Sequence, residues 1–396
     1  MPASLPVLIA GAGPVGLVAA AALHRQGIPV VVLEAEGALP DELRASTFHA
    51  PTLDMLDELG AAQPMIAEGL VAPHVQYRNR DHSLIAAFDF TDIADLTRHP
   101  FRVQVEQYKL VRILARLLAG QPGFTLRLGA AVEGAEDLGD RVRVTLSNGE
   151  AVEGSWLIGA DGAHSAVRRA AGIDFQGFTW PERFLVLSTP YEFADAIPGL
   201  ADVSYYADPE EWFFLLRVPG LWRAMFPVKP EVSEEEIASD AFAAARMARI
   251  GVGPDRFEIR HRTLYRVHQR VAESFRKGRI LLAGDAAHIN NPLGGMGLNG
   301  GVHDAVNLAE KLGQVMLHGA DAALLDRYDR QRRGVTVEHV QRQTIANKQN
   351  LEAATPEAQA DFRRRMAEAA ADKAKAHAYL TQISMLGSLR RAAEIQ

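Results

Sequence analysis

Three glycines near the start of the chain constrain its fold more than any other feature. Gly11, Gly13 and Gly16 follow a short apolar run, and an Ala-rich helical pattern begins among them at Pro14. In such a motif the first glycine permits a tight turn, the second lets the backbone approach a pyrophosphate, and the third lets the helix pack on the strand. The unpaired N–H groups that begin the helix attract an anion. The pattern therefore predicts a strand–turn–helix unit that binds a dinucleotide.

An acidic residue ends the next predicted strand, residues 30–34. Glu34 follows Gly16 by eighteen residues, where a carboxylate can accept hydrogen bonds from both ribose hydroxyls of an adenosine. Its charge would repel a 2′-phosphate, so NADP is disfavoured at this position. The strand, turn, helix and strand form a right-handed βαβ unit, which starts a parallel sheet. These residues do not distinguish FAD from NAD.

Composition and charge narrow the possible functions. The chain of 396 residues carries a net charge of −7, which opposes attraction to nucleic-acid phosphates. It has no cysteine, which excludes a cysteine nucleophile and thiolate ligands for iron–sulfur clusters. No spacing of His and carboxylates predicts a metal site, so redox chemistry would need an organic cofactor. Residues 7–23 are apolar, but glycines interrupt them and no Lys or Arg precedes them. We therefore expect a cytoplasmic protein without a membrane segment.

Changes in periodicity divide the rest of the chain. Asn148-Gly149 predicts a hairpin between strands at 141–146 and 151–158. Residues 179–265 crowd aromatic side chains into strand-like runs, with a second hairpin signal at Pro219-Gly220. These runs predict a separate, sheet-based lobe.

The pattern of a parallel sheet resumes after this lobe. Residues 279–283 form an apolar, strand-like run, and residues 299–317 follow a helical pattern. The last part of the chain, residues 323–396, is helical, rich in Ala, Arg and Gln, and expected to pack against the body. The lobe is therefore inserted into the nucleotide-binding fold.

Two further segments place an acid at the end of a predicted strand. Asp161 follows one strand, and Ser165 can cap a helix that begins at Ala166. Asp285 follows another strand and precedes a stretch, residues 294–301, with five glycines in eight residues. Open α/β sheets bind ligands at the carboxyl ends of their strands. Glycines there let bare backbone N–H groups approach a planar or anionic group.

Together, in this order and spacing, the three segments resemble the class A flavoprotein monooxygenases, the family of para-hydroxybenzoate and phenol hydroxylases. The resemblance covers nearly the whole chain. It implies that the first segment binds the ADP part of FAD, and that the segment around Asp161 is associated with both FAD and the nicotinamide cofactor. The residues of the first segment are Gly11, Gly13, Pro14, Gly16 and Glu34.

The same resemblance implies further contacts with FAD. Asp285 would hydrogen-bond the ribityl chain. Arg44 and Gln107 would contact the cofactor between its phosphates and the ribityl chain, and Val132 would offer backbone contacts to adenine. The isoalloxazine would be lined by Pro292, Gly295, Gly297, Leu298 and Asn299.

Pattern and resemblance together predict an α/β fold: a Rossmann-like FAD-binding domain with an inserted sheet-based substrate lobe and C-terminal helices. We expect the FAD-binding domain in three parts, the lobe in two, and the helices in one. The three parts of the FAD-binding domain are 1–72, 105–178 and 271–322, the two parts of the lobe are 73–104 and 179–270, and the C-terminal helical segment is 323–396.

The resemblance also implies the reaction. NADH or NADPH would reduce FAD, oxygen would add to give a hydroperoxyflavin, and this would hydroxylate a small aromatic or heteroaromatic substrate. The protein must position the ring and exclude water. The motifs assign no catalytic residue and leave the substrate open, and we expect a monomer or a homodimer.

Candidate pocket residues come from the aromatic lobe, although an ordinary aromatic core explains them equally well. If Pro219-Gly220 closes a two-residue hairpin, Arg217 lies opposite Trp222 and can stack on it. His288, close to the flavin aspartate, is expected to be structural. The candidates are Tyr205, Tyr206, Phe213, Arg217, Trp222 and Met225.

Two alternatives remain open at this point. A FAD-dependent reductase of the same fold would share the glycine segments but transfer no oxygen. A nucleotide-sensing flavoprotein would keep the fold without turnover, although it has no evident use for a glycine-lined flavin face. A halogenase is disfavoured because residues 212–228 lack a W-x-W-x-I-P segment.

Overall fold

The computed structural model describes residues 5–41, 45–208, 210–352 and 355–396. A mostly parallel sheet starts at the glycine motif, with the strand order β18-β19-β12-β1-β2-β8. Every residue of β1, β12 and β19 is buried, as expected for strands that are covered on both faces. The strands are β1 (Val7–Ala10), β2 (Val30–Leu33), β8 (Phe124–Arg127), β12 (Trp156–Gly159), β19 (Ile280–Leu282) and the antiparallel β18 (Arg276–Lys277).

Three of these strands end at the same level. Ala10 pairs with Gly159, and Gly159 pairs with Leu282, all in parallel register. The turns that follow β1, β12 and β19 therefore leave the sheet at one edge. The three segments that the sequence singled out meet there, as the Rossmann-like prediction requires.

Helices cover this sheet. α1 (Pro14–His24) packs between α4 (Gln107–Leu118) and α8 (Met296–His318), and α5 (Ala166–Ala170) follows β12. α4 has the bounds that its helical pattern suggests. The predicted start of α8 at Asn299 is wrong by three residues, because Gly295 adopts a left-handed backbone, with φ of 66°, and turns the chain into the helix at once. Gly297 to Asn299 are therefore the first turn of α8.

A three-stranded sheet, β11-β10-β9, lies beside the parallel one. Its strands are β9 (Val132–Asp137), β10 (Val142–Leu146) and β11 (Ala151–Gly154), and the predicted hairpin joins the last two. The single strand predicted at 151–158 is wrong, because the chain crosses from β11 to β12 at Ser155. The backbone N–H and the hydroxyl of Ser155 both donate to the carbonyl of Pro6, at 2.8 and 3.2 Å.

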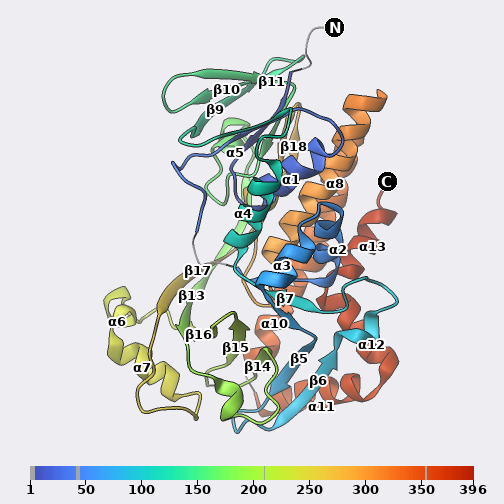
Figure 1. Cartoon of the computed structure of the whole chain (residues 1–396). Helices are drawn as coiled ribbons and strands as arrows, with labels where there is room; N and C mark the ends of the chain where they lie inside the picture. Colours follow the sequence, from blue (N-terminus) through green and yellow to red (C-terminus); the bar gives the residue numbers. More distant parts are fainter. Residues whose placement is uncertain (1–4, 42–44, 209, 353–354) are drawn as a thin grey trace.

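The lobe is built on an eight-stranded sheet, β20-β17-β13-β16-β15-β14-β5-β6. In the chain, β5 and β6 come before β8 and β12 of the FAD-binding fold, and the other six strands of the lobe sheet come after them. β13 and β17 are long and pair with each other from the parallel sheet into the lobe (Figure 1). The strands are β5 (His74–Arg78), β6 (Leu84–Asp89), β13 (Phe175–Thr189), β14 (Val203–Tyr206), β15 (Phe213–Val218), β16 (Leu221–Val228), β17 (His261–Ala272) and β20 (His288–Ile289).

Each face of the lobe sheet has its own core. One face packs on α6 (Glu234–Ala238) and α7 (Asp240–Ala248), which the strand-like sequence pattern missed. The other face packs on the C-terminal helices. β13 and β17 run through the predicted domain boundaries near residues 178 and 270, so the domain limits remain a prediction.

The hairpin at Pro219-Gly220 has the predicted register. Arg217 on β15 pairs with Trp222 on β16, and the guanidinium carbon lies 5.8 Å from the centre of the indole ring. Arg217 also forms an ion pair of 2.6 Å with Glu192. These contacts hold Arg217 without a ligand.

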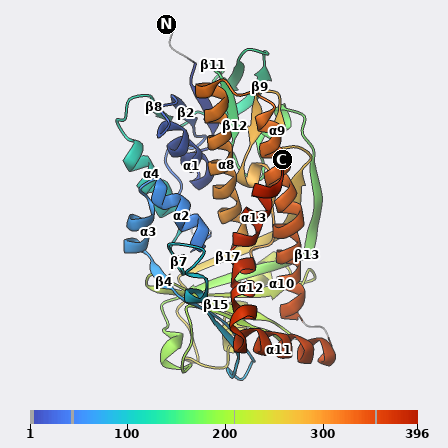
Figure 2. The same ribbon diagram turned by 90° about the vertical axis from the view of Figure 1, so that its right-hand side faces the viewer.

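The C-terminal part is helical, as predicted, and packs along one side of the molecule (Figure 2). Phe362, Met366, Leu380 and Ile383 enter the core on the second face of the lobe sheet. Among the described residues, no helix combines the length and apolar composition needed to cross a bilayer. The elements are α9 (Leu324–Val335), the π-helix η4 (Thr336–Gln341), α10 (Arg342–Glu352), α11 (Pro356–Ala371), α12 (Lys373–Ile383) and α13 (Leu386–Glu394).

A small sheet, β3-β7-β4, connects the FAD-binding fold and the lobe. β3 and β4 both pair with β7, which places β7 between them. Its strands and the short helices nearby are β3 (Thr47–Phe48), α2 (Ala50–Glu58), α3 (Ala62–Glu68), β4 (Leu70–Ala72), η1 (Phe90–Ile93) and β7 (Arg102–Gln104), while η2 (Phe193–Asp195) and η3 (Gly284–Ala286) lie elsewhere.

Candidate functional site

The glycine turn after β1 leaves room for a ligand at one position only. A Cβ atom on Gly11 would lie 2.5 Å from the carbonyl oxygen of Ala160, and one on Gly16 would collide with the carbonyl of Gly11. A Cβ atom on Gly13, in contrast, would meet nothing within 4 Å. Gly13 is the N-cap residue of α1. Gly11 and Gly16 thus allow close packing, and Gly13 and Pro14 begin a helix whose N-terminus faces open space. This arrangement fits a pyrophosphate.

Glu34 is fixed at the mouth of the same turn. Its carboxylate accepts hydrogen bonds from the backbone N–H groups of Ala12, at 2.6 Å, and Glu36, at 3.0 Å. The side chain remains partly exposed. It is therefore oriented at the end of β2, the position at which a ribose would meet it.

Asp161 lies at the end of β12 and supports the start of α5. Its Oδ2 accepts a hydrogen bond from the N–H of Val167 at 3.1 Å, while its buried Oδ1 has no partner among the residues described. Ser165 caps the helix, as predicted, by accepting from the N–H of Arg168 at 2.9 Å. The Arg168 guanidinium donates to the carbonyl of Ala286 at 2.8 Å. The second and third segments are thus tied together.

Asp285 is exposed between buried neighbours, and a charged cluster below it holds the turn in place. The carboxylate of Asp304, on α8, accepts from the N–H of Gly284 at 3.1 Å and contacts His288 Nε2 and Arg332 Nε at 2.7 Å each. Burial alone would raise the pKa of Asp304, but His288 and Arg332 hold it well below its usual range. His288 is therefore structural, as predicted, and the exposed side chain of Asp285 lies at the open edge of the sheet.

Asn299 joins the glycine-rich turn to β3. Its amide donates to the carbonyls of Thr47, at 2.9 Å, and Gly295, at 2.6 Å, and its oxygen accepts from the N–H of His49 at 2.9 Å. The side chain is fully buried and fixes the turn. Its contact with the flavin remains a prediction. Of the other residues predicted to line the isoalloxazine, all are half-buried: Pro292, Gly295, Gly297 and Leu298.

Three predicted cofactor residues remain, and the structure describes two of them. Gln107 opens α4, and its N–H donates to the carbonyl of Ala45 at 3.0 Å. Val132 begins β9 and is partly buried. Arg44 lies outside the described residues. The binding roles of all three remain predictions.

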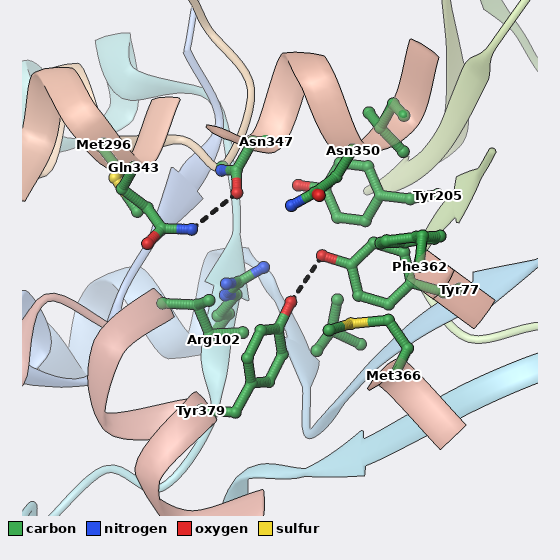
Figure 3. Close-up of a pocket in the computed structure, with 14 residues that line it drawn as sticks. Tyr77, Arg102, Tyr205, Met296, Gln343, Asn347, Asn350, Phe362, Met366 and Tyr379 are labelled. Atoms are coloured by element: carbon green, nitrogen blue, oxygen red, sulfur yellow. Dashed lines mark hydrogen bonds between the residues drawn. The ribbon is translucent and has the colours of Figure 1, made fainter. Parts of the chain in front are cut away.

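A partly enclosed pocket lies where the lobe sheet, the start of α8 and the C-terminal helices meet (Figure 3). Its aromatic and aliphatic walls leave about 30 Å³ of free volume, roughly the space of one water molecule. Gly294 and Met296 bring it next to the glycine-rich turn. The lining residues are Val75, Tyr77, Arg102, Tyr205, Gly294, Met296, Gln343, Asn347, Asn350, Leu351, Phe362, Met366, Tyr379 and Ile383.

Two tyrosines share a hydrogen bond in this pocket. The hydroxyls of Tyr77 and Tyr379 are 2.7 Å apart, and the rings of Tyr77 and Tyr205 stack with centroids 5.5 Å apart (Figure 3). Burial raises the pKa of Tyr379 to about 12 and that of Tyr77 well above its ordinary value. Both hydroxyls therefore stay protonated at physiological pH.

Arg102 supplies a buried positive charge to the same pocket. It is 2% exposed, and its guanidinium carbon lies 5.0 Å from the centre of the Phe90 ring. Burial raises the pKa of Tyr205, and the charge of Arg102 beside it opposes that rise. Arg102 hydrogen-bonds the Tyr205 side chain. Within the described part of the chain no carboxylate forms an ion pair with Arg102, and its buried Nε has no hydrogen-bond partner. A buried cation without a counter-charge is costly, so this position favours an anionic ligand group.

The residues that the sequence suggested for the pocket lie on both faces of the lobe sheet. Tyr205 lines it, whereas Tyr206, Phe213 and Trp222 belong to the core on the opposite face of the sheet. Met225 lies on the pocket's face of the sheet without lining it. Sequence reasoning missed the residues with the clearest chemistry: Tyr77, Arg102 and Tyr379.

The comparisons with known proteins agree with this arrangement. Residues 4–343 match the family model described as FAD binding domain. Para-nitrophenol 4-monooxygenase from a Pseudomonas species is 33% identical over 394 residues, which cover 97% of this chain and 96% of the relative. 6-Hydroxy-3-succinoylpyridine 3-monooxygenase from Pseudomonas putida is 36% identical over 351 residues, 87% of this chain and 88% of the relative.

A solved structure matches the whole fold. The crystal structure of p-nitrophenol 4-monooxygenase from Pseudomonas putida superposes with a TM-score of 0.90 at 31% sequence identity and covers 98% of both chains. The match includes the lobe and the C-terminal helices as well as the nucleotide-binding fold. The chain therefore belongs to the FAD-binding domain family of class A flavoprotein aromatic monooxygenases, and FAD is its cofactor.

Proposed function

We propose that this FAD-dependent aromatic monooxygenase hydroxylates a single-ring phenol or hydroxypyridine that carries a second, anionic or oxygen-rich group. The observation that carries the proposal is the pocket beside Gly294, in which a pair of hydrogen-bonded tyrosines faces Arg102, whose buried Nε has no hydrogen-bond partner. NADH or NADPH supplies the electrons. One atom of O2 enters the substrate and the other leaves as water.

The chain's residues fit FAD along one continuous path. Bound FAD supplies the reduction of oxygen and the transfer of one oxygen atom to the ring. The open N-terminus of α1 would hold its pyrophosphate, Glu34 its adenosine ribose and Asp285 its ribityl chain. The half-buried turn that ends at Leu298 would line the isoalloxazine, because it separates the sheet edge from the pocket.

The tyrosine pair would bind the substrate hydroxyl and pass its proton on to water. A phenol that loses its proton becomes a more electron-rich ring, which favours attack on an electrophilic oxygen. Each neutral hydroxyl can take up a proton only as it gives up its own, so a proton can move along the 2.7 Å hydrogen bond and leave to water while both tyrosines stay neutral. The raised pKa values of Tyr77 and Tyr379 keep this relay protonated at rest.

Arg102 would bind the second group of the substrate. A guanidinium donates in a planar fork that matches a carboxylate or a nitro group. The buried Nε without a partner shows that the chain does not use all of this fork itself. The two relatives are named for para-nitrophenol and for a hydroxypyridine with a succinoyl group, and both compounds combine a ring hydroxyl with an oxygen-rich substituent.

A substrate panel tests this proposal. 4-Nitrophenol, 4-hydroxybenzoate and a hydroxypyridine carboxylate should stimulate NADH or NADPH consumption by the FAD-loaded protein, and 4-cresol, which lacks the second group, should stimulate it much less. Products formed under isotopically labelled dioxygen should carry one labelled oxygen atom. Oxidation of NAD(P)H without label in any product would contradict the proposal and favour a reductase of the same fold.

The proposal extends to the state of the protein in the cell. We propose a cytoplasmic enzyme that is a monomer or a homodimer. The absence of cysteine from the sequence supports a chain that needs no disulfide bond. Light scattering during chromatography measures the mass, and a species larger than a dimer would contradict this part.

A further inference from the structure

A second, larger cavity shares a wall with the aromatic pocket. It lies between the π-helix η4 with α10 on one side and α12 with α13 on the other, and it has a volume of about 470 Å³. Met296 and Gln343 line both cavities. The other lining residues are Glu338, His339, Val340, Arg342, Ala346, Ala378, Thr381, Gln382, Met385, Gly387 and Ser388.

The two volumes differ in what they can hold. The inner pocket has about 30 Å³ of free space, too little for an aromatic ring, so its walls must move before a substrate can enter. The second cavity falls in the range of small-molecule sites. None of the residues predicted to bind FAD lines it. Its occupant is therefore not the cofactor.

The wall between the cavities consists of flexible side chains. Gln343 Nε2 donates to Asn347 Oδ1 at 2.8 Å (Figure 3). Gln382 Nε2 donates to Gln343 Oε1, and Asn347 Nδ2 donates to the carbonyl of Leu293 at 3.1 Å. This chain of amides leads from the protein surface to the turn beside Gly294. Amide hydrogen bonds of this kind exchange readily for bonds to a polar ligand or to water. The wall can open without unfolding any element.

The outer end of the second cavity reaches solvent. Glu338, Arg342, Ala378 and Gln382 are exposed, whereas Val340, Met385 and Ser388 are buried. The π-helical turn η4, at residues 336–341, forms part of its wall, and such turns occur frequently at functional sites. The cavity thus connects the surface with the wall of the inner pocket.

We propose that the second cavity is an outer chamber through which the substrate reaches the inner pocket. A single-ring phenol binds there first, and displacement of Gln343 and Met296 then admits it to Tyr77 and Arg102. This inference rests on the proposed function, because it takes the inner pocket as the site of hydroxylation. It adds a second binding site for the same phenolic substrate.

Filling the chamber should slow substrate binding. Ala378 lines the chamber from α12, and Ala374, one turn earlier on the same helix, is exposed and does not line it. We expect Ala378→Phe in the FAD-loaded protein to lower the association and dissociation rate constants of 4-nitrophenol by tenfold or more, with a smaller change in Kd. Stopped-flow absorbance of 4-nitrophenol itself measures both rates, and Ala374→Phe should match the unaltered protein.

A second variant tests the wall from the opposite direction. Gln343→Ala removes the central amide of the hydrogen-bonded chain and should raise both rate constants severalfold. Equal rates in Ala378→Phe and Ala374→Phe, or unchanged rates in Gln343→Ala, would overturn the chamber while leaving the hydroxylase proposal intact. If the unaltered FAD-loaded protein neither binds nor hydroxylates any phenol, both proposals fail.

Discussion

The hydroxyl oxygens of Tyr77 and Tyr379 lie 2.7 Å apart, although 302 positions separate the two residues in the chain. Tyr77 is on β5 of the lobe sheet, and Tyr379 is on α12. The pair therefore forms only when the C-terminal helices pack on the lobe. This contact couples the completion of the fold to the assembly of the proposed proton relay.

Tyr379→Phe should separate proton removal from binding. The variant keeps the ring and loses the hydroxyl, so kcat for a phenol that is neutral in solution should fall about a hundredfold, the lower range for a lost acid–base group. Kd for the substrate should change less than threefold. A substrate already ionised in solution should lose much less activity. Steady-state kinetics with both kinds of phenol measure this, and Tyr191→Phe, in the core on the opposite face of the lobe sheet, serves as control.

Arg102→Met should discriminate between substrates by charge. Loss of a charge-assisted hydrogen bond should weaken binding of 4-hydroxybenzoate by about 1.5 to 3 kcal/mol, or roughly ten- to 150-fold. The affinity for 4-cresol should be nearly unchanged. Because Arg102 is buried without a described counter-ion, its removal should leave the melting temperature equal or higher. An equal loss of affinity for both ligands would contradict the proposed anion site.

Asp285→Ala tests the ribityl contact. Its carboxylate is exposed at the edge of the sheet while its neighbours are buried, so the change should weaken FAD binding by about 1.5 to 3 kcal/mol, the range for a hydrogen bond to a charged group. Titration of the apoprotein with FAD, followed by quenching of flavin fluorescence, measures the loss. Asp140→Ala, at an exposed turn between β9 and β10, is the matched control. Unchanged FAD affinity in Asp285→Ala would remove this assignment.

Asp304→Asn should destabilise the whole FAD-binding fold. The change leaves Arg332 buried beside a neutral side chain, and breaking a buried ion pair on one side costs about 3 to 5 kcal/mol. Urea unfolding should show this loss. The double variant Asp304→Asn with Arg332→Gln should recover part of it, because no unpaired charge remains. Additive losses in the double variant would show that the pair is not coupled.

His303 predicts how stability depends on pH. Burial, together with the charge of Arg332, lowers the pKa of His303 to about 3, whereas an unfolded histidine has a pKa of about 6.5. Between these values the unfolded chain binds a proton that the folded chain does not. The free energy of unfolding should therefore fall as pH drops from about 6.5 toward 3, by up to about 1.4 kcal/mol per pH unit for this group.

Replacing the side chain isolates this contribution. His303→Gln can keep a hydrogen bond to Thr52, which the histidine contacts at 3.0 Å, and should flatten the acid slope of stability. His318→Gln, at the exposed end of α8, should not. Parallel slopes for the unaltered protein and His303→Gln would show that His303 titrates normally in the folded state.

The sequence predicted the parts of the site that depend on local geometry. A glycine turn after a buried strand has few alternatives, so the edge formed by the turns after β1, β12 and β19 could be placed from sequence spacing and family resemblance. For the same reason both hairpin signals were correct, and Pro219-Gly220 also gave the register. The start of α8 was misplaced because a left-handed Gly295 can begin a helix without a polar cap, whereas the sequence pattern began the helix at Asn299.

The substrate pocket could not be predicted in this way. Neighbouring residues of a strand point to opposite faces, so Tyr205 enters the pocket while Tyr206 enters the other core. The pairing of strands that are distant in sequence decides which of the two side chains faces the pocket. Arg102 and Tyr379 join the pocket through β7 and α12, two segments whose own patterns indicate an ordinary strand and an ordinary packed helix. A lone arginine between Phe101 and Val103 was the one available signal.

The fate of labelled dioxygen tests the central claim most directly. The FAD-loaded protein, supplied with NADH or NADPH and 4-hydroxybenzoate or 4-nitrophenol, is allowed to consume a measured amount of the reduced nucleotide, and the product is analysed by mass spectrometry. We expect one labelled oxygen atom in the product for each nucleotide oxidised. Complete oxidation of the nucleotide with all labelled oxygen recovered as hydrogen peroxide, for every phenol tried, would contradict the account.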